Sequence, residues 1–204
     1  TRTHNLLQIL SQGTGFIRQL IYISTTGVYG DCQGAVIDET RPLRPKSARA
    51  TRRVSAEAQV RAWGNAHAVR VQVLRVPGIY AQDRLPVERI KRQAPALLPS
   101  EDVYTNHIHA DDLARLIAYV LFRGRAQRVI NACDSSHLKM GDYFDLVAEA
   151  FALPKPPRVS QEKLAQLVDP MMLSFMSESR QIQNQRLKEL RFTLQYPTVQ
   201  DCLK

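Results

Sequence analysis

The densest group of side chains that could do chemistry lies in one short stretch with two histidines and two aspartates, namely His107, His109, Asp111 and Asp112. Imidazole nitrogens and carboxylate oxygens are common metal ligands, but the spacing here matches no established ligand motif. The aspartates also open an apolar, helix-like run, where acids cap free N–H groups and complement the helix dipole. We therefore predict a structural role for this group and no metal site.

A second concentration is basic and falls between positions 41 and 53 of a chain with formal net charge +9. It consists of Arg41, Arg44, Lys46, Arg49, Arg52 and Arg53. The planar guanidinium group suits phosphate, so the cluster could bind a nucleotide; a solvated helix face explains it equally well. No nucleic-acid-binding module or aromatic stacking position accompanies it, and we do not predict nucleic acid as a partner.

The bulk properties are those of a globular protein. The chain has 204 residues, of which 44% are apolar and 23% charged, enough for one domain or a domain with a small appendage. No apolar run approaches the roughly 18 residues of a membrane span, and the first residues lack a signal-peptide pattern. Three widely spaced cysteines, Cys32, Cys133 and Cys202, favour reduced thiols in the cytoplasm.

The elements that must position these residues alternate between strands and helices. Short apolar runs predict strands over 19–24, 69–74 and 128–131, and an extended piece over 106–109. Apolar periodicity predicts helices over 48–63, 111–122 and 140–152, and shorter ones over 85–93, 160–168 and 184–190. A long loop joins residues 25 and 46. The alternation predicts an α/β domain with a parallel sheet, and a proline-rich break after residue 153 predicts a small, mostly helical lobe over 154–204.

Four short motifs then follow one another in a characteristic order. They are Ile21-Tyr-Ile-Ser-Thr-Thr-Gly-Val-Tyr-Gly-Asp31, Asp38-Glu39-Thr40 with Pro42, Leu74-Arg-Val-Pro-Gly-Ile-Tyr80, and Asn106-His-Ile-His-Ala-Asp-Asp-Leu-Ala114. Together they resemble the extended short-chain dehydrogenases/reductases, the NAD-dependent epimerase/dehydratase family. The resemblance covers essentially the whole chain. It implies a Rossmann-like, doubly wound parallel sheet, incomplete in this chain, over residues 1–153, with 154–204 on the substrate side.

The resemblance also implies roles for residues at the strand ends. Thr25 would hold a substrate hydroxyl, although a threonine at a strand end can equally bond to its own loop. Ser24 beside it would contact the cofactor, NAD or NADP. The segment Val76, Pro77, Gly78 and Ile79 would form the wall of the nicotinamide site.

Two family positions are changed in this chain. The catalytic tyrosine and its lysine partner correspond to Arg49 and Arg53, a combination that resembles the YeeZ-like branch of the family. Arg53 could still bind ribose or phosphate. Arg49 is a poor proton shuttle because a guanidinium group stays protonated at accessible pH. We therefore predict Tyr80 as the alternative proton donor, with Arg49 binding an anionic group.

The glycine-rich dinucleotide fingerprint, which should follow a strand and open a helix, is missing. The nearest candidate, Gly13-Thr-Gly15, follows a helix-like run and is better explained as a helix stop. About the first third of a family member has no counterpart here, so we expect either a fragment or a chain whose N-terminal part is not in this sequence.

The function that the resemblance implies is that of an NAD(P)-dependent epimerase/dehydratase-like oxidoreductase or isomerase. Its substrate would be a hydroxylated small molecule, a sugar nucleotide being one candidate, and a homo-oligomer is a further expectation. The alternative is a non-catalytic member of the same fold that binds a nucleotide or a partner protein, because the Tyr/Lys pair is lost.

Overall fold

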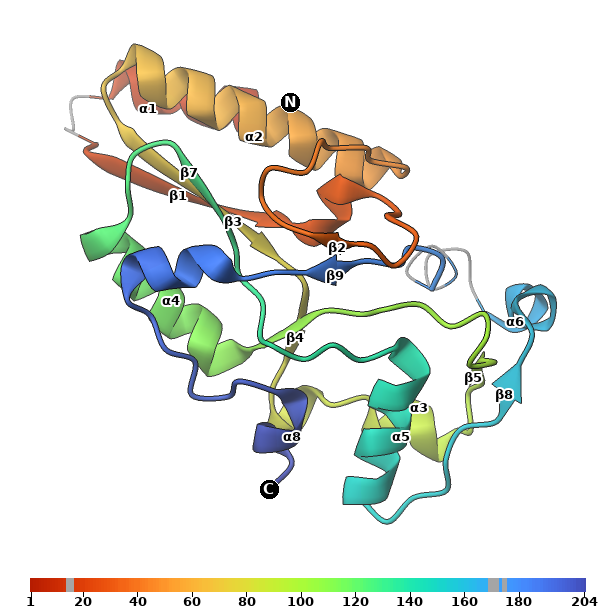
Figure 1. The fold of residues 1–204 in the computed structure, drawn as a ribbon. Helices are drawn as coiled ribbons and strands as arrows, with labels where there is room; N and C mark the ends of the chain where they lie inside the picture. Colours follow the sequence, from red (N-terminus) through yellow and green to blue (C-terminus); the bar gives the residue numbers. More distant parts are fainter. Residues whose placement is uncertain (14–16, 169–172, 174–175) are drawn as a thin grey trace.

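The computed structural model describes residues 1–13, 17–168, 173 and 176–204, so the Thr14 and Gly15 of the predicted helix stop lie outside the described residues. Its central sheet contains three parallel strands, β1 (Gln19–Thr25), β3 (Arg70–Val76) and β7 (Arg128–Asn131), in the order β1-β3-β7. Helices α1 (Arg2–Gln12) and α2 (Ala48–Ala66) cover one face of this sheet, and α4 (Ala110–Arg123) covers the other (Figure 1).

Strand β3 carries apolar side chains on both of its faces, as expected for a strand inside a parallel sheet with helices on either side. Val71 and Val73 pack with Trp63 of α2. Leu74 and Val76 pack in a second cluster with Leu113, Leu116 and Val120 of α4. The two clusters sandwich the sheet, which confirms the predicted α/β fold with a parallel sheet.

A second region lies beyond the sheet and contains a core of its own. Two small parallel pairs, β4 (Gly78–Tyr80) with β6 (His107–His109) and β5 (Ala96–Leu97) with β8 (Arg158–Val159), form there. The helices in this region are α3 (Val87–Lys91), α5 (Met140–Ala150), α6 (Gln161–Leu167) and the short α8 (Val199–Cys202). Their buried residues, among them Ile90, Phe144 and Leu164, make one apolar cluster.

The structure differs from the sequence prediction mainly in the irregular parts. The loop after β1 contains a short 3-10 helix, η1 (Thr26–Tyr29), and a strand, β2 (Val36–Ile37), which pairs with β9 (Gln181–Ile182). The helix predicted over 184–190 is a 3-10 helix, η3 (Gln185–Leu190).

The C-terminal segment returns to earlier parts of the chain at two places, since β8 pairs with β5 and β9 pairs with β2. A domain boundary after residue 153 stays a prediction. Within the part of the chain that is described, no helix has the length and apolar character needed to cross a membrane.

Candidate active site at the carboxyl ends of the strands

A cavity of about 510 Å³ lies where β1 and β3 end. Parallel strands present their carboxyl ends at one edge of a sheet, which is where open α/β sheets bind ligands. Thr25 closes β1, and Pro77 and Gly78 follow β3 directly; all three line the cavity, as does Arg49 from the first turn of α2. Further lining residues come from the start of the loop after β1, from the N-terminal ends of α2 and α3, from α5, and from the segments 104–107 and 178–180.

Thr25 makes the local loop bond considered from sequence and also lines the cavity, while its role in holding a substrate hydroxyl stays a prediction. The backbone N–H of Gly27 donates to Thr25 Oγ1 at 3.3 Å, so the side chain caps η1. This bond uses the hydroxyl oxygen as an acceptor. The same residue lines the cavity, and its hydroxyl proton is not used in the bond with Gly27. The structure thus places Thr25 where it can donate a hydrogen bond to a ligand.

Ser24, by contrast, points into the protein. Its Oγ donates to Glu57 Oε1 at 2.5 Å, and the residue is 5% exposed. Glu57 lies on α2 and forms a buried ion pair with Arg75 of β3, the Nη2–Oε2 distance being 2.8 Å. Ser24 therefore helps to fix α2 against the ends of β1 and β3, and its predicted contact with a cofactor stays a prediction.

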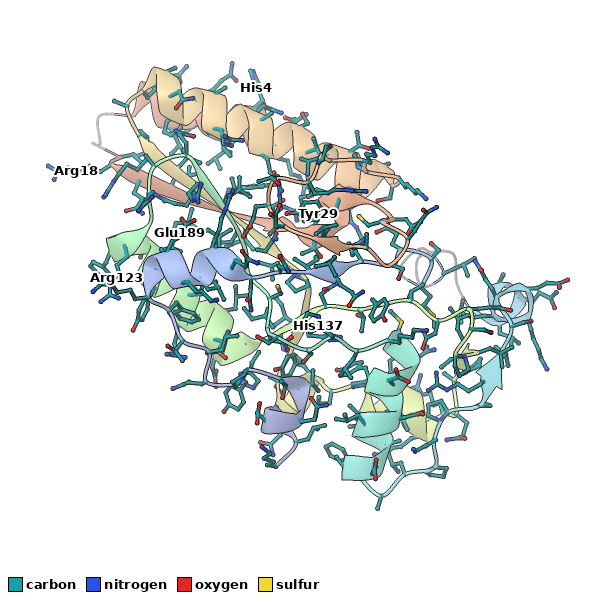
Figure 2. The ribbon with its side chains drawn as sticks, in the orientation of Figure 1. His4, Arg18, Tyr29, Arg123, His137 and Glu189 are labelled. Atoms are coloured by element: carbon teal, nitrogen blue, oxygen red, sulfur yellow. The ribbon has the colours of Figure 1, made fainter. Side chains whose placement is uncertain are left out.

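This buried network continues across the sheet to β7. Arg75 Nη1 donates to Tyr29 Oη at 2.9 Å, and Tyr29 donates in turn to Asn131 Oδ1 at 2.7 Å. Figure 2 labels Tyr29, which lies between α2 and the central sheet. Burial raises the pKa of Tyr29 above its ordinary value although Arg75 opposes this. The network holds the Val-Tyr-Gly segment, and with it Thr25, in a fixed position.

Arg49 and Arg53, the residues at the family's Tyr and Lys positions, lie in different places. Arg49 lines the cavity. Arg53 is one turn further along α2, is exposed and is absent from the cavity lining; its Nη1 donates to Tyr22 Oη at 3.1 Å. Its predicted contact with ribose or phosphate stays a prediction.

Three further predicted residues also lie outside the cavity lining. Val76 is buried in the core on the α4 side of the sheet, and Ile79 is exposed. Tyr80 is 1% exposed, its Oη donates to the carbonyl oxygen of Thr198 at 3.3 Å, and burial raises its pKa above the ordinary value. The role of Tyr80 as a proton donor stays a prediction.

His107 lines the cavity, although sequence reasoning gave it only a structural role. It is 6% exposed, its Nδ1 has no hydrogen-bond partner among the residues that the structure describes, and burial lowers its pKa to about 4. The imidazole is therefore neutral at neutral pH. Gly78 pairs with it in the β4–β6 register, and a Cβ at position 78 would lie 3.2 Å from His107 Cδ2. This close approach gives a physical reason for a glycine at position 78.

His109 and Asp112 have the structural roles that the sequence predicted. His109 caps α4 through Nδ1, which accepts the backbone N–H of Asp111 at 3.2 Å. Asp112 accepts the backbone N–H groups of Gln195 and Tyr196 at 2.9 and 2.8 Å. No three His, Cys, Asp or Glu residues within the described ranges gather as a metal site would require. His4 and His137, both labelled in Figure 2, are exposed, and neither is among the residues that line the cavity.

Two arginines on the far walls of the cavity were not singled out by sequence as site residues. Arg89 comes from α3, and Arg180 follows Glu178, with which it forms an ion pair of 2.7 Å. In sequence, Arg89 is one of several basic residues in an ordinary amphipathic stretch, and only its partial burial in the structure distinguishes it from the exposed Lys91 and Arg92.

Comparison with known proteins places this cavity in context. The chain is 28% identical over 159 residues to dTDP-glucose 4,6-dehydratase from Streptomyces griseus, covering 74% of this chain and 48% of that protein. It is 26% identical over 141 residues to protein YeeZ from Escherichia coli K12, covering 69% of this chain and 48% of YeeZ. The chain thus spans about half the length of these curated relatives.

Solved structures share the fold over nearly the whole chain. A conserved protein of unknown function from Silicibacter pomeroyi superposes with a TM-score of 0.83 and 36% identity, over 96% of this chain and 67% of that one. RMD from Pseudomonas aeruginosa, solved with NADPH, gives a TM-score of 0.76 at 21% identity, over 98% of this chain and 68% of that one.

The family comparison agrees with the motifs and with the position of the cavity. The family model described as NAD dependent epimerase/dehydratase family matches residues 2–133, which include α1, the three sheet strands and every predicted site residue. This chain belongs to the NAD-dependent epimerase/dehydratase family.

Proposed function

We propose that the protein is an NAD(P)-dependent oxidoreductase of the epimerase/dehydratase type that acts on a hydroxylated small molecule. The observation that carries this proposal is the cavity shared by Thr25, Pro77 and Gly78 at the carboxyl ends of β1 and β3. Its volume, about 510 Å³, is typical of a small-molecule site. A cytoplasmic location, which the three free cysteines favour, belongs to the same proposal.

The cavity fits the nicotinamide end of the cofactor better than the pyrophosphate end. Pro77 and the exposed Gly78 offer a flat wall without a Cβ at position 78. The glycine-rich turn that would hold the pyrophosphate is not in this sequence. When bound, the cofactor supplies hydride transfer. The residues of this chain would then bind and orient the substrate, with Thr25 donating a hydrogen bond to its hydroxyl.

Proton transfer is the step for which the family's own residues are replaced. Arg49 lines the cavity but stays protonated, so it would bind an anionic group there. Of the groups in the lining, His107 is a neutral imidazole beside Gly78 that can hydrogen-bond a substrate hydroxyl. A sugar nucleotide is one candidate substrate, because the curated relatives include a dTDP-glucose dehydratase.

The second candidate function is binding without turnover. Arg49 and Arg53 in place of the Tyr/Lys pair favour it, as does the burial of Tyr80 outside the cavity lining. In this reading the cavity holds a nucleotide or a related ligand and no hydride moves.

Hydride transfer separates the two. The full-length gene product is mixed with NAD⁺ or NADP⁺ and a panel of sugar nucleotides and simpler alcohols, and absorbance at the reduced nicotinamide band is followed. We expect turnover with at least one substrate, and kcat/KM about 10- to 100-fold lower in Thr25→Val because a hydrogen bond to the substrate is lost. Thr51→Val, on the exposed side of α2, is the matched control. Cofactor binding without turnover across the panel would instead establish the non-catalytic function.

A further inference from the structure

Most of the charged side chains in the described part of the cavity lining are arginines. Among the described residues, Arg49, Arg89 and Arg180 line it, together with one carboxylate, that of Glu178. Glu178 pairs with Arg180 at 2.7 Å. Arg89, by contrast, has no carboxylate within 4.0 Å among the described residues. Among the described residues, no carboxylate therefore neutralises the charge that Arg89 brings to the cavity.

Arg89 is held in a defined position, and within the described ranges only one of its hydrogen bonds is made, by Nη2. Its guanidinium carbon lies 4.9 Å from the ring centroid of Phe144, so the group stacks on an aromatic face. One terminal nitrogen, Nη2, donates to the carbonyl oxygen of Pro95 at 2.7 Å. The Nε atom is buried and has no hydrogen-bond partner. A guanidinium has five N–H donors, and the contacts that orient this one in the described part of the chain are with a ring and a carbonyl.

Arg89 is partly buried, and even partial burial of an unpaired cation is costly. Desolvation lowers the pKa of Arg89, and no opposing charge compensates for it. Buried cations are normally paired, and a buried donor without a partner costs free energy. The Nε of Arg180 is a second buried donor without a partner in the same lining. An anionic ligand with several acceptor oxygens would satisfy these donors and neutralise the charge of Arg89.

We propose that the ligand of this cavity carries an oxyanion group, a carboxylate or a phosphate, and that Arg89 is the residue that binds it. The proposal rests on the function proposed above for its assignment of the cavity as a substrate site. Arg89 belongs to the wall formed by α3 and α5, whereas the residues assigned to the nicotinamide follow β3. The anion is therefore part of the substrate, and Arg89 determines which hydroxylated molecules the site accepts.

The test is a calorimetric titration of the full-length gene product with inorganic phosphate and with L-malate, at low ionic strength. We expect at least one probe to bind and its affinity to fall about 10- to 100-fold in Arg89→Gln, as for loss of a charge-assisted hydrogen bond. Arg89→Lys keeps the charge but loses the planar guanidinium group, so its affinity for the probe should lie between those of the parent and of Arg89→Gln. Arg92→Gln is the matched control, because Arg92 carries the same charge at the end of the same helix but is exposed and outside the lining.

Three results would overturn the proposal. One is that neither probe binds the parent protein. Another is that Arg89→Gln, with an unchanged circular dichroism spectrum, binds the probe as the parent does, or that Arg92→Gln loses as much affinity. The last is that NADP⁺ displaces the probe competitively, which would assign the anion to the cofactor. Hydride transfer has no part in these readouts, so failure of the catalytic proposal is detected separately.

Discussion

Individual buried side chains carry most of the unusual electrostatics of this protein, and Asp134 is the clearest case. It follows β7, is 3% exposed, and its Oδ2 has no hydrogen-bond partner. Its Oδ1 accepts the backbone N–H of Ser136 at 2.9 Å. Burial raises its pKa from 3.8 to about 7; the bond from Ser136 opposes this shift and the charge of Asp112 adds to it. Between about pH 4 and pH 7, the folded state therefore keeps a proton on Asp134 that the unfolded chain would release.

This carboxyl should make stability depend on pH. Because its folded pKa lies above its unfolded value, its favourable contribution is complete below about pH 4 and is lost as the pH rises through about 7. Asp134→Asn mimics the protonated form, so its free energy of unfolding should rise relative to the parent between pH 4 and pH 8, by roughly 4 kcal/mol at most. Urea denaturation at the two pH values measures the difference. Asp111→Asn, at an exposed position, should show no comparable change, and an equal response in both variants would contradict the assignment to Asp134.

At the scale of single residues, the sequence predicted those whose position follows from a motif at a strand end. Thr25 and Gly78 belong to this class, because the carboxyl ends of parallel strands must meet. His107 and Arg89 could not be recognised in the same way. His107 resembles its neighbour His109 in sequence, but one lines the cavity and the other caps α4. Arg89 differs from Arg92 only in burial, which depends on tertiary packing.

Among the elements, the segment between β1 and α2 does the most to shape the cavity, and Gly30 is the residue that permits its path. Gly30 has φ of +67°, a conformation that residues with a Cβ rarely adopt. A Cβ there would lie 2.0 Å from the carbonyl oxygen of Arg44, so the two arms of the loop approach at this point. Arg180 Nη1 also donates to the Gly30 carbonyl oxygen at 2.8 Å, which ties the turn to the cavity wall.

Gly30→Ala should accordingly destabilise the protein by at least about 1–3 kcal/mol. The new Cβ would both strain the backbone at positive φ and clash with the carbonyl oxygen of Arg44, a main-chain atom that cannot move freely. Gly13→Ala is the matched control, because Gly13 has φ of −69° and its nearest neighbours would be in ordinary contact with a new Cβ. Thermal unfolding of the two variants provides the comparison. Equal midpoints would show that the loop relaxes around the new methyl group.

The regular elements were predictable because their signals are local. Periodicity and β-branched runs located β7 at its observed bounds, and β1, β3, α2 and α4 to within about three residues. The short strands β2, β5, β8 and β9 were not predicted, since each contains two residues and exists only through a partner far along the chain. The pairing of β9 with β2 holds the chain directly after the Glu178–Arg180 segment, so this wall of the site could not be foreseen from local sequence.

For the molecule as a whole, the most consequential feature is the open edge of the central sheet. Within the described residues, β1 pairs with β3 on one side and has no strand on the other. The nearby apolar side chains are unusually accessible, with Ile23 of β1 38% exposed and Leu6 and Ile9 of α1 52% and 66% exposed. An unpaired edge beside exposed apolar groups is a template for association with another chain.

We therefore expect the 204-residue chain to associate with itself, which light scattering over a range of protein concentrations would detect. Replacing Ile9 and Ile23 together by lysine should shift the equilibrium toward monomer, because charge at an edge opposes strand pairing and the apolar contact is lost. Phe122→Lys is the control: it removes a residue that is 86% exposed on α4, which covers the opposite face of the sheet. Restoration of the monomer by Phe122→Lys alone would move the association site to α4. If the parent chain instead stays monomeric at all concentrations, the expected association is wrong. Its sheet would then need no further strand, although the chain spans about half the length of the curated relatives.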